Sequence, residues 1–243
     1  MSGGLADVRY SYAFQPIVDI NAQAIWSYEA LIRGTRGEGA GSVYARVDRL
    51  DLHEFDRQSR GVAIEIAGRL GVACSLNLNA LPGSLADGTA GVERTVASAL
   101  AAGLSVDQLV LEVTESEVIE DAVVLCERLN AYRAAGIRIA IDDFGAGYAG
   151  LNLLADLQPD VLKLDMTLVR GIDGRGARQS IVRAILQVSL DLGIDVVAEG
   201  VETMREYEWL AELGLVLFQG YLIAKPAFES LPAIMLPRVQ AAR

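Results

Sequence analysis

Two adjacent carboxylates, Asp142 and Asp143, follow a short apolar run in the sequence IAIDDFGAGY at residues 139–148. The run is typical of a buried parallel strand, and the carboxyl ends of such strands hold the active sites of α/β barrels. Neighbouring strand residues point to opposite faces, so both carboxylates can face one point only if the strand has ended. We expect Gly145 and Gly147 to end it, because glycine adopts backbone angles that other residues avoid. Crowded carboxylates repel each other, and a divalent cation relieves that repulsion.

This short motif alone is equally typical of a solvated turn with an aspartate helix cap. Other polar residues favour the functional interpretation, because each lies within or just after a different expected strand. A barrel brings such strand ends together, and buried carboxylates need a cation or another partner. Oxygen ligands suit Mg²⁺ or Mn²⁺ and disfavour a structural Zn²⁺, while the only histidine, His53, falls in a helical stretch. The polar set comprises Glu29, Asn77, Glu112, Asp142 with Asp143, Lys163, Glu199 and Gln219. Lys163 stands inside an apolar strand, which favours a buried, functional ammonium over a surface lysine.

Strands and helices alternate along most of the chain, which predicts a mostly parallel sheet. Eight strand candidates in one domain of this length favour a closed barrel. The first two are close enough to form a hairpin, so we expect an α/β fold, a modified TIM (β/α)8 barrel with one antiparallel strand. The expected strands cover residues 12–20, 24–33, 74–79, 109–113, 138–142, 161–165, 195–200 and 215–221. The expected helices lie within 43–70, 89–102, 118–132, a short segment after 148, 181–192 and 203–213, with a last one from about Glu229.

Composition limits the class of protein. The chain has 243 residues, 52% of them hydrophobic, and we expect a loose tail at residues 1–9 and a single domain at 10–243. No apolar run reaches about 18 residues and no signal peptide precedes Val8, which predicts a soluble, cytoplasmic protein. The net charge of −11 argues against binding duplex nucleic acid or anionic membranes, although metals can still bring in an anionic ligand. Cys74 and Cys126 lie in apolar segments, which favours free, buried thiols.

The order of motifs resembles the EAL domain family of cyclic di-GMP phosphodiesterases. Glu29-Ala30-Leu31 is the tripeptide that gives the family its name. The resemblance spans roughly residues 12–230, and a series of motifs in order is far more specific than any one of them. It implies the modified barrel expected above. The other matching segments are FQPIVD at 14–19, LNL at 76–78, EVTE at 112–115, DDFGAGY at 142–148, KLD at 163–165, AEGVE at 198–202 and QGY at 219–221.

The resemblance also implies residue roles. The reaction would be hydrolysis of one phosphodiester bond of cyclic di-GMP to linear pGpG, with two divalent cations, Mg²⁺ or Mn²⁺, and with Ca²⁺ inhibitory. The implied metal ligands are Glu29, Asn77, Glu112, Asp142, Asp143 and Glu199, with Asp142 bridging both ions. The implied catalytic set is Lys163, which orients or activates the attacking water, Glu199, and Glu115, which anchors the loop after Asp143. The implied substrate-binding residues are Gln15, Arg33, Asp165 and Gln219, with Arg33 on a phosphate.

The chain departs from the common family pattern outside the expected metal positions. Residues 145–150 read GAGYAG where many members have GTGYSS, Gly34 replaces a frequent tryptophan, and Asn79 replaces a frequent serine. These variants resemble EAL domains fused to BLUF light sensors, which implies a regulatory sensor protein or domain as a partner. Because no metal position is changed, we expect an active enzyme. The alternative is a noncatalytic cyclic di-GMP receptor or protein-docking domain. The kinase-like DFG at 143–145 lacks the other kinase motifs and is a local coincidence.

A homodimer is also expected, through the segment at residues 145–157. It pairs a glycine-rich loop with a short helix, and the family commonly dimerises beside this loop. Core packing explains the same periodicity equally well, because buried and interfacial helices share it. The leucines concerned are Leu151, Leu153, Leu154 and Leu157.

Overall fold

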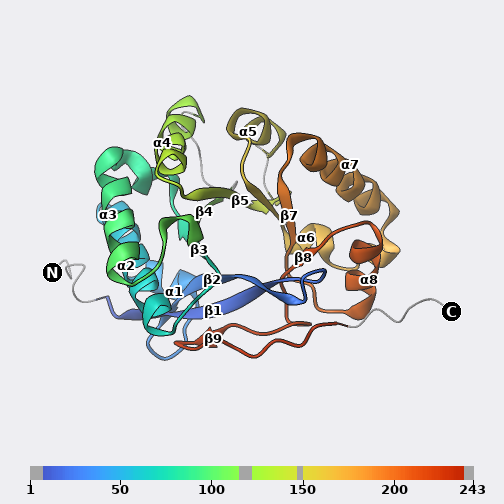
Figure 1. The fold of residues 1–243 in the computed structure, drawn as a ribbon, viewed down its shortest axis with the longest axis horizontal. Helices are drawn as coiled ribbons and strands as arrows, with labels where there is room; N and C mark the ends of the chain where they lie inside the picture. The colour runs from blue at the N-terminus through green and yellow to red at the C-terminus, as the bar shows by residue number, and fades with distance from the viewer. Residues whose placement is uncertain (1–7, 115–121, 147–149, 238–243) are drawn as a thin grey trace.

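The computed structural model describes residues 8–114, 122–146 and 150–237. Within these ranges, eight strands close into a barrel in the order β2-β3-β4-β5-β6-β7-β8-β1, and β1 completes the ring by pairing with β2 (Figure 1). A ninth short strand, β9, pairs with β1 outside the ring. The strands are β1 (Tyr10–Asp19), β2 (Ala24–Gly34), β3 (Ser75–Ala80), β4 (Leu109–Thr114), β5 (Arg138–Phe144), β6 (Val161–Leu164), β7 (Asp195–Ala198), β8 (Leu217–Phe218) and β9 (Ala227–Phe228).

The larger helices surround the barrel, so that both faces of its strands are covered (Figure 1). The α-helices are α1 (Ala40–Tyr44), α2 (Leu52–Arg69), α3 (Thr89–Ala101), α4 (Ala122–Ala134), α5 (Gly150–Leu157), α6 (Met166–Val169), α7 (Gly176–Leu192) and α8 (Met204–Glu212). Short 3-10 helices cover Pro82–Asp87, Val106–Gln108 and Ile172–Gly174. The predicted modified TIM barrel is therefore confirmed, including the antiparallel hairpin of β1 and β2, while β2 to β8 run parallel.

The barrel interior is built in layers, and this layering positions the polar residues. An apolar cluster fills one layer: Ile17, Val110, Ala140, Val161, Val197 and Leu217. On five strands, the residue two positions later belongs to the polar set predicted from the sequence: Glu112, Asp142, Lys163, Glu199 and Gln219. Because side chains alternate along a strand, residues two apart share a face, so these polar groups point into the barrel on the carboxyl-end side of the apolar layer.

Three expectations about the helices and strands are wrong. β5 does not end at Asp142 but continues to Phe144, because Phe144 still pairs with Leu164 after an irregularity at Asp143, where φ is 54° and the register with β6 shifts. The helix expected from Glu229 is absent from residues 229–237. Ala227–Phe228 pairs with β1 instead, and the prolines at 226, 232 and 237 disfavour a helix there. The last barrel strand is also shorter than the expected 215–221.

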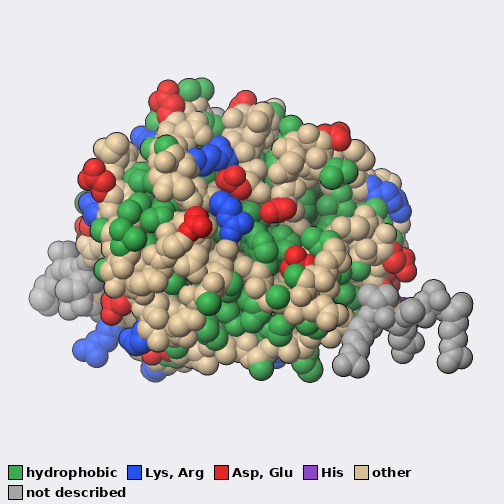
Figure 2. Space-filling model, in the orientation of Figure 1, with side chains coloured by type: hydrophobic (Ala, Val, Ile, Leu, Met, Phe, Trp, Pro, Cys, Tyr) green, Lys and Arg blue, Asp and Glu red, His purple; other side chains and the backbone are tan. Residues whose placement is uncertain are grey.

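On the side shown in Figure 2, acidic and basic side chains lie close together near the centre. This side therefore carries no large patch of one charge sign. Among the described residues, none of the helices combines the length and hydrophobicity that crossing a bilayer requires. Cys74 and Cys126 are free thiols, as predicted, although both are only half-buried.

Candidate functional site

Lys163 occupies the centre of the polar layer, and its side chain is 1% exposed. The buried position expected for it is therefore confirmed. From β6, its ammonium group reaches carboxylates that come from β2, β4, β5 and the end of β7. Nζ lies 2.6 Å from Glu199 Oε1, 2.8 Å from Glu112 Oε1, 3.0 Å from Asp142 Oδ1 and 3.4 Å from Glu29 Oε2.

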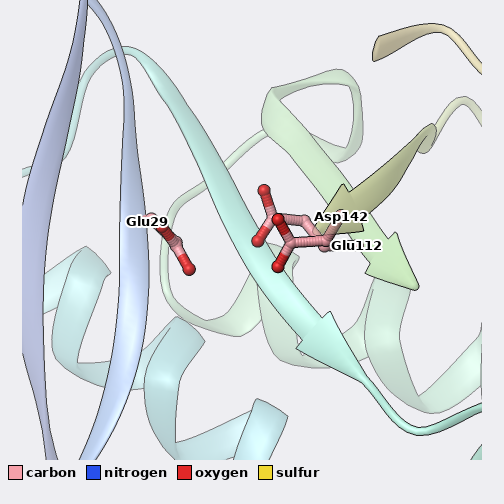
Figure 3. A group of neighbouring side chains, drawn as sticks. All are labelled: Glu29, Glu112 and Asp142. Carbon is pink, nitrogen blue, oxygen red and sulfur yellow. The ribbon is translucent and has the colours of Figure 1, made fainter. Parts of the chain in front are cut away.

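The carboxylates form two groups that share Asp142. The first acidic group is Glu29, Glu112 and Asp142, and the second acidic group is Asp142, Asp143 and Glu199. In each group, one oxygen from every residue lies within 4.8 Å of the others. Figure 3 shows Glu29 pointing from β2 across the interior toward Glu112 and Asp142. The left-handed backbone at Asp143 lets two adjacent aspartates serve one group, which a regular strand would forbid.

Amide side chains orient the carboxylates of the first acidic group. Asn77 Nδ2 donates to Glu112 Oε1 at 2.7 Å, while Glu29 accepts from Asn79 Nδ2 at 3.2 Å and from Gln219 Nε2 at 2.7 Å. Among the described residues, Asn77 Oδ1 and Glu112 Oε2 are buried oxygens without a hydrogen-bond partner. Such an acceptor is costly unless a donor or a cation meets it. The oxygen donors therefore fit a hard divalent cation.

The cluster is also short of positive charge. Burial raises the pKa of Glu112 to about 8 and that of Asp143 to about 6, although Lys163 lowers both. Burial likewise raises the pKa of Glu199 well above its usual range. For Glu29, burial acts in the same direction, but Lys163 and two amide donors hold its pKa below the ordinary value. Two divalent cations would offset the four excess negative charges that five carboxylates and one ammonium carry when all are ionised.

A cavity of 520 Å³ opens over this cluster. Of the residues assigned to substrate by sequence, Arg33, Gln15 and Gln219 line it, and the Gln15 amide donates to the Ala224 carbonyl at 3.0 Å. Asp165 is not among the lining residues and instead caps α6, where it accepts from the backbone N–H of Thr167. Glu115, together with Gly147 and Tyr148, lies outside the described residues.

The sequence interpretation missed the helical wall of the cavity. Asp56 and Arg60 on α2 form a buried ion pair, and Tyr44 donates to Asp56 Oδ1 at 3.2 Å. All three residues line the cavity. Oppositely charged residues four positions apart on a helix usually form an ion pair on the exposed face. The spacing of Asp56 and Arg60 therefore does not reveal that this pair is buried in a cavity wall. The mostly apolar residues that flank them, Phe55, Ala63 and Ile64, are the only local hint of burial.

Comparison with known proteins agrees with this geometry. The sequence profile of the EAL domain family matches residues 3–226. The blue light- and temperature-regulated antirepressor BluF of Escherichia coli K12 is 36% identical over 229 residues, which are 93% of this chain and 56% of BluF. The cyclic di-GMP phosphodiesterase NbdA of Pseudomonas aeruginosa is 34% identical in an alignment 242 residues long that covers 91% of this chain and 29% of NbdA. The chain thus spans only part of the length of these relatives.

Solved structures of Klebsiella pneumoniae BlrP1 with cyclic di-GMP are similar in both sequence and fold. The calcium complex is 42% identical with a TM-score of 0.89, and the match covers 95% of this chain and 58% of that chain. The manganese complex is 42% identical with a TM-score of 0.87, covering 94% and 59% respectively. The fold of this chain is therefore similar to that of BlrP1, whose structures were solved in complex with cyclic di-GMP.

Proposed function

The chain belongs to the EAL domain family, and we propose that it hydrolyses one phosphodiester bond of cyclic di-GMP to give linear pGpG. The observation that carries the proposal is the pair of acidic groups that share Asp142 and surround the buried Lys163. The names of NbdA and of the BlrP1 complexes support the choice of substrate. Such a reaction would lower the level of a bacterial second messenger.

We assign the two acidic groups to two divalent cations, Mg²⁺ or Mn²⁺. The first acidic group with Asn77 would hold one ion and the second acidic group the other, with Asp142 between them. When bound, such a pair supplies a water of lowered pKa and a clamp on the phosphate for in-line attack. Lys163 orients the attacking water and offsets negative charge, since its ammonium already contacts both acidic groups. Arg33 lines the cavity and binds a phosphate of the substrate.

Hydrolysis is tested by incubating the purified protein with cyclic di-GMP and separating the nucleotides by chromatography. We expect pGpG to form with Mg²⁺ or Mn²⁺ and its formation to stop when a chelator is added, because the carboxylates need cations to hold a phosphate. The assay is run on monomeric and dimeric fractions at high protein concentration. Absence of product in both fractions would refute the proposal.

The alternative function is a noncatalytic cyclic di-GMP receptor or docking domain. BluF, the relative that is 36% identical, carries the name of an antirepressor, and this observation favours the alternative. The complete set of acidic groups favours the enzyme, since a receptor has no need of a shared carboxylate between two ions. Binding of cyclic di-GMP in calorimetry without any pGpG would support the receptor. A sensor protein or domain as regulatory partner is part of either proposal.

Replacing the activating ion with Ca²⁺ should leave the site occupied and the enzyme inhibited. Ca²⁺ takes longer bonds and more ligands than Mg²⁺, so it fits carboxylates without placing the nucleophile correctly. Calorimetry with Ca²⁺ should show binding, while the nucleotide assay should show little pGpG. Adding Mn²⁺ in excess should restore turnover. Full activity in Ca²⁺ alone, with other metals removed, would contradict this expectation.

We also propose that the chain forms a homodimer beside the loop that follows β5. Of the four leucines considered, Leu153, Leu154 and Leu157 pack in the core of this chain, whereas Leu151 is 69% exposed. The interface would therefore depend on Leu151 rather than on all four side chains. Sedimentation should show a concentration-dependent dimer, and Leu151→Asp should shift it toward monomer because the new charge would be buried at the contact.

A matched control for this dimer test is Leu100→Asp. Leu100 is 62% exposed on α3, far along the chain from the loop, and its substitution should leave the sedimentation profile unchanged. A wild-type protein that stays monomeric at high concentration would rule out the dimer. An equal effect of both substitutions would rule out this location for the interface.

A further inference from the structure

A buried carboxylate outside the acidic groups, Glu206 in the first turn of α8, joins two loops that border the cavity. Its side chain accepts through Oε1 from Gly171 N at 2.8 Å, and through Oε2 from Glu202 N at 3.1 Å and Thr203 N at 3.0 Å. Gly171 follows α6, whereas Glu202 and Thr203 follow β7. Glu206 as a whole residue is only 2% exposed. Its side chain therefore ties the loop after β6 to the loop after β7 from a buried position.

The short helix α6 lies between the loop that directly follows β5, the strand of Asp142 and Asp143, and the loop after β7 that begins with Glu199. On one side, a Cβ added at Gly145, in the loop after β5, would lie 2.4 Å from Leu168 Cδ1. On the other side, a Cβ added at Gly200, in the loop after β7, would lie 2.5 Å from Met166 Cβ. At Gly200 the atom met is Met166 Cβ, which cannot move without the backbone of α6, whereas Leu168 Cδ1 could turn aside; both glycines also have a positive φ, 98° at Gly145 and 62° at Gly200, that disfavours other residues. Helix α6 is therefore packed directly against both loops, through Leu168 on one side and Met166 on the other.

The bonds of Glu206 anchor the segment that follows α6 through an ionised, buried acceptor. Burial raises the pKa of Glu206, but the three backbone N–H donors outweigh it and keep the pKa below the ordinary value, so the group stays ionised. Hydrogen bonds to an ionised acceptor are about twice as strong as neutral ones. The nearby ion pair of Arg170 and Glu202 is more than one-third exposed on both sides, so solvent weakens it.

We propose that Glu206 is a positioning residue for the second acidic group: by fixing the end of α6 against the loop after β7, it holds Glu199 at the distance from Asp142 and Asp143 that a shared cation requires. This inference rests on the two-cation function proposed above. Glu206 is not among the residues that line the cavity, and it would act through the backbone of Gly171 and Glu202. One of the three bonds that the side chain accepts, from Thr203 N, belongs to the capping box of α8, and the test must separate this cap from the tie to Gly171.

The test compares Glu206→Ala and Glu206→Gln with the matched control Thr203→Ala. Thr203→Ala removes the hydroxyl that accepts from Glu206 N, yet it leaves the carboxylate bonds to both loops. Calorimetry with Mn²⁺ should show unchanged affinity for one ion and roughly 10- to 100-fold weaker affinity for the other in Glu206→Ala, as for other residues that orient metal ligands. The paramagnetic resonance signal of the coupled Mn²⁺ pair should weaken accordingly, and kcat should fall with little change in KM. Glu206→Gln should recover part of these losses, because its carbonyl oxygen can still accept, and Thr203→Ala should resemble wild type.

The inference is overturned if Glu206→Ala binds the second Mn²⁺ as wild type does, or if Thr203→Ala weakens it equally. Should Glu206→Ala not fold, Glu206→Gln decides by the same titration. A wild-type protein that binds two Mn²⁺ but makes no pGpG would refute the proposed hydrolysis and leave the titration to decide the role of Glu206. A wild-type protein that binds only one Mn²⁺ would refute both.

Discussion

Replacing Lys163 with alanine should lower the single-turnover rate by roughly two to four orders of magnitude, while Mn²⁺ still binds at least as tightly as in wild type. The ammonium lies within 3.0 Å of oxygens on Glu112, Asp142 and Glu199, so its removal takes a positive charge away from the place where the cations would sit. Repulsion of the incoming cations falls, but orientation of the attacking water is lost. Substrate should still bind, because Arg33 remains. The measurement is calorimetry with Mn²⁺ beside rapid-quench hydrolysis.

Lys163→Met is the matched control for this prediction. Methionine preserves most of the buried aliphatic volume, so a loss of rate shared by both variants is due to the missing charge and not to a cavity.

In the presence of a chelator, both Lys163 variants should melt at a lower temperature than wild type, because Lys163 contacts carboxylates of both acidic groups. Adding Mn²⁺ should remove most of that difference. Wild-type turnover in Lys163→Ala would show that the assigned role is wrong.

Replacing Asp142 with asparagine should weaken the binding of both cations and abolish most turnover. The substitution keeps the size of the side chain but removes the one negative charge that belongs to both acidic groups. Metal binding and activity should therefore fall together, in contrast to the separation expected for Lys163. Loss of a shared ligand should reduce activity by at least the roughly 10- to 100-fold found for groups that merely orient ligands. Calorimetry with Mn²⁺ and single-turnover hydrolysis measure the two effects.

Asp160→Asn provides the comparison for Asp142→Asn. Asp160 lies beside the start of β5, where its carboxylate accepts from Ile139 N at 2.8 Å, and an asparagine oxygen can accept the same bond. This variant should keep wild-type Mn²⁺ affinity and turnover. If Asp142→Asn also kept wild-type metal affinity, Asp142 would not lie between two cations.

The sequence predicted the acidic groups because their positions follow from strand periodicity. Glu112, Asp142, Lys163 and Glu199 each stand two residues after an apolar residue of the barrel interior, so one alternation rule places them all inside. The antiparallel hairpin was equally predictable, since only a short turn separates β1 from β2. Motif order then added roles that periodicity cannot supply.

Features that depend on a single backbone angle or on tertiary contacts were not predictable. Asp143 adopts a left-handed φ inside β5, and although aspartate takes this conformation more readily than most residues, its type alone does not single out this position. Ala227–Phe228 pairs with β1, a contact between opposite ends of the chain that local pattern does not encode. Asp165 has the right motif neighbours, yet its carboxylate caps α6, because the first N–H groups of any helix need an acceptor. In the sequence, Glu206 has only the spacing of a capping-box residue at the start of a helix. Its second role, as a link to the loop after β6, depends on the bond from Gly171 N, which the sequence does not show.

The central claim is that the cluster around Lys163 is a two-cation centre and not a group of carboxylates neutralised by lysine alone. The most direct measurement is anomalous diffraction from crystals grown with Mn²⁺. The account predicts two manganese peaks, roughly 3.5–4 Å apart as in other two-metal sites, with the Asp142 carboxylate between them. One peak lies at the first acidic group and the other at the second acidic group. A structure at saturating Mn²⁺ that shows no peak, or a single peak away from Asp142, with Lys163 still contacting all four carboxylates, would contradict the account.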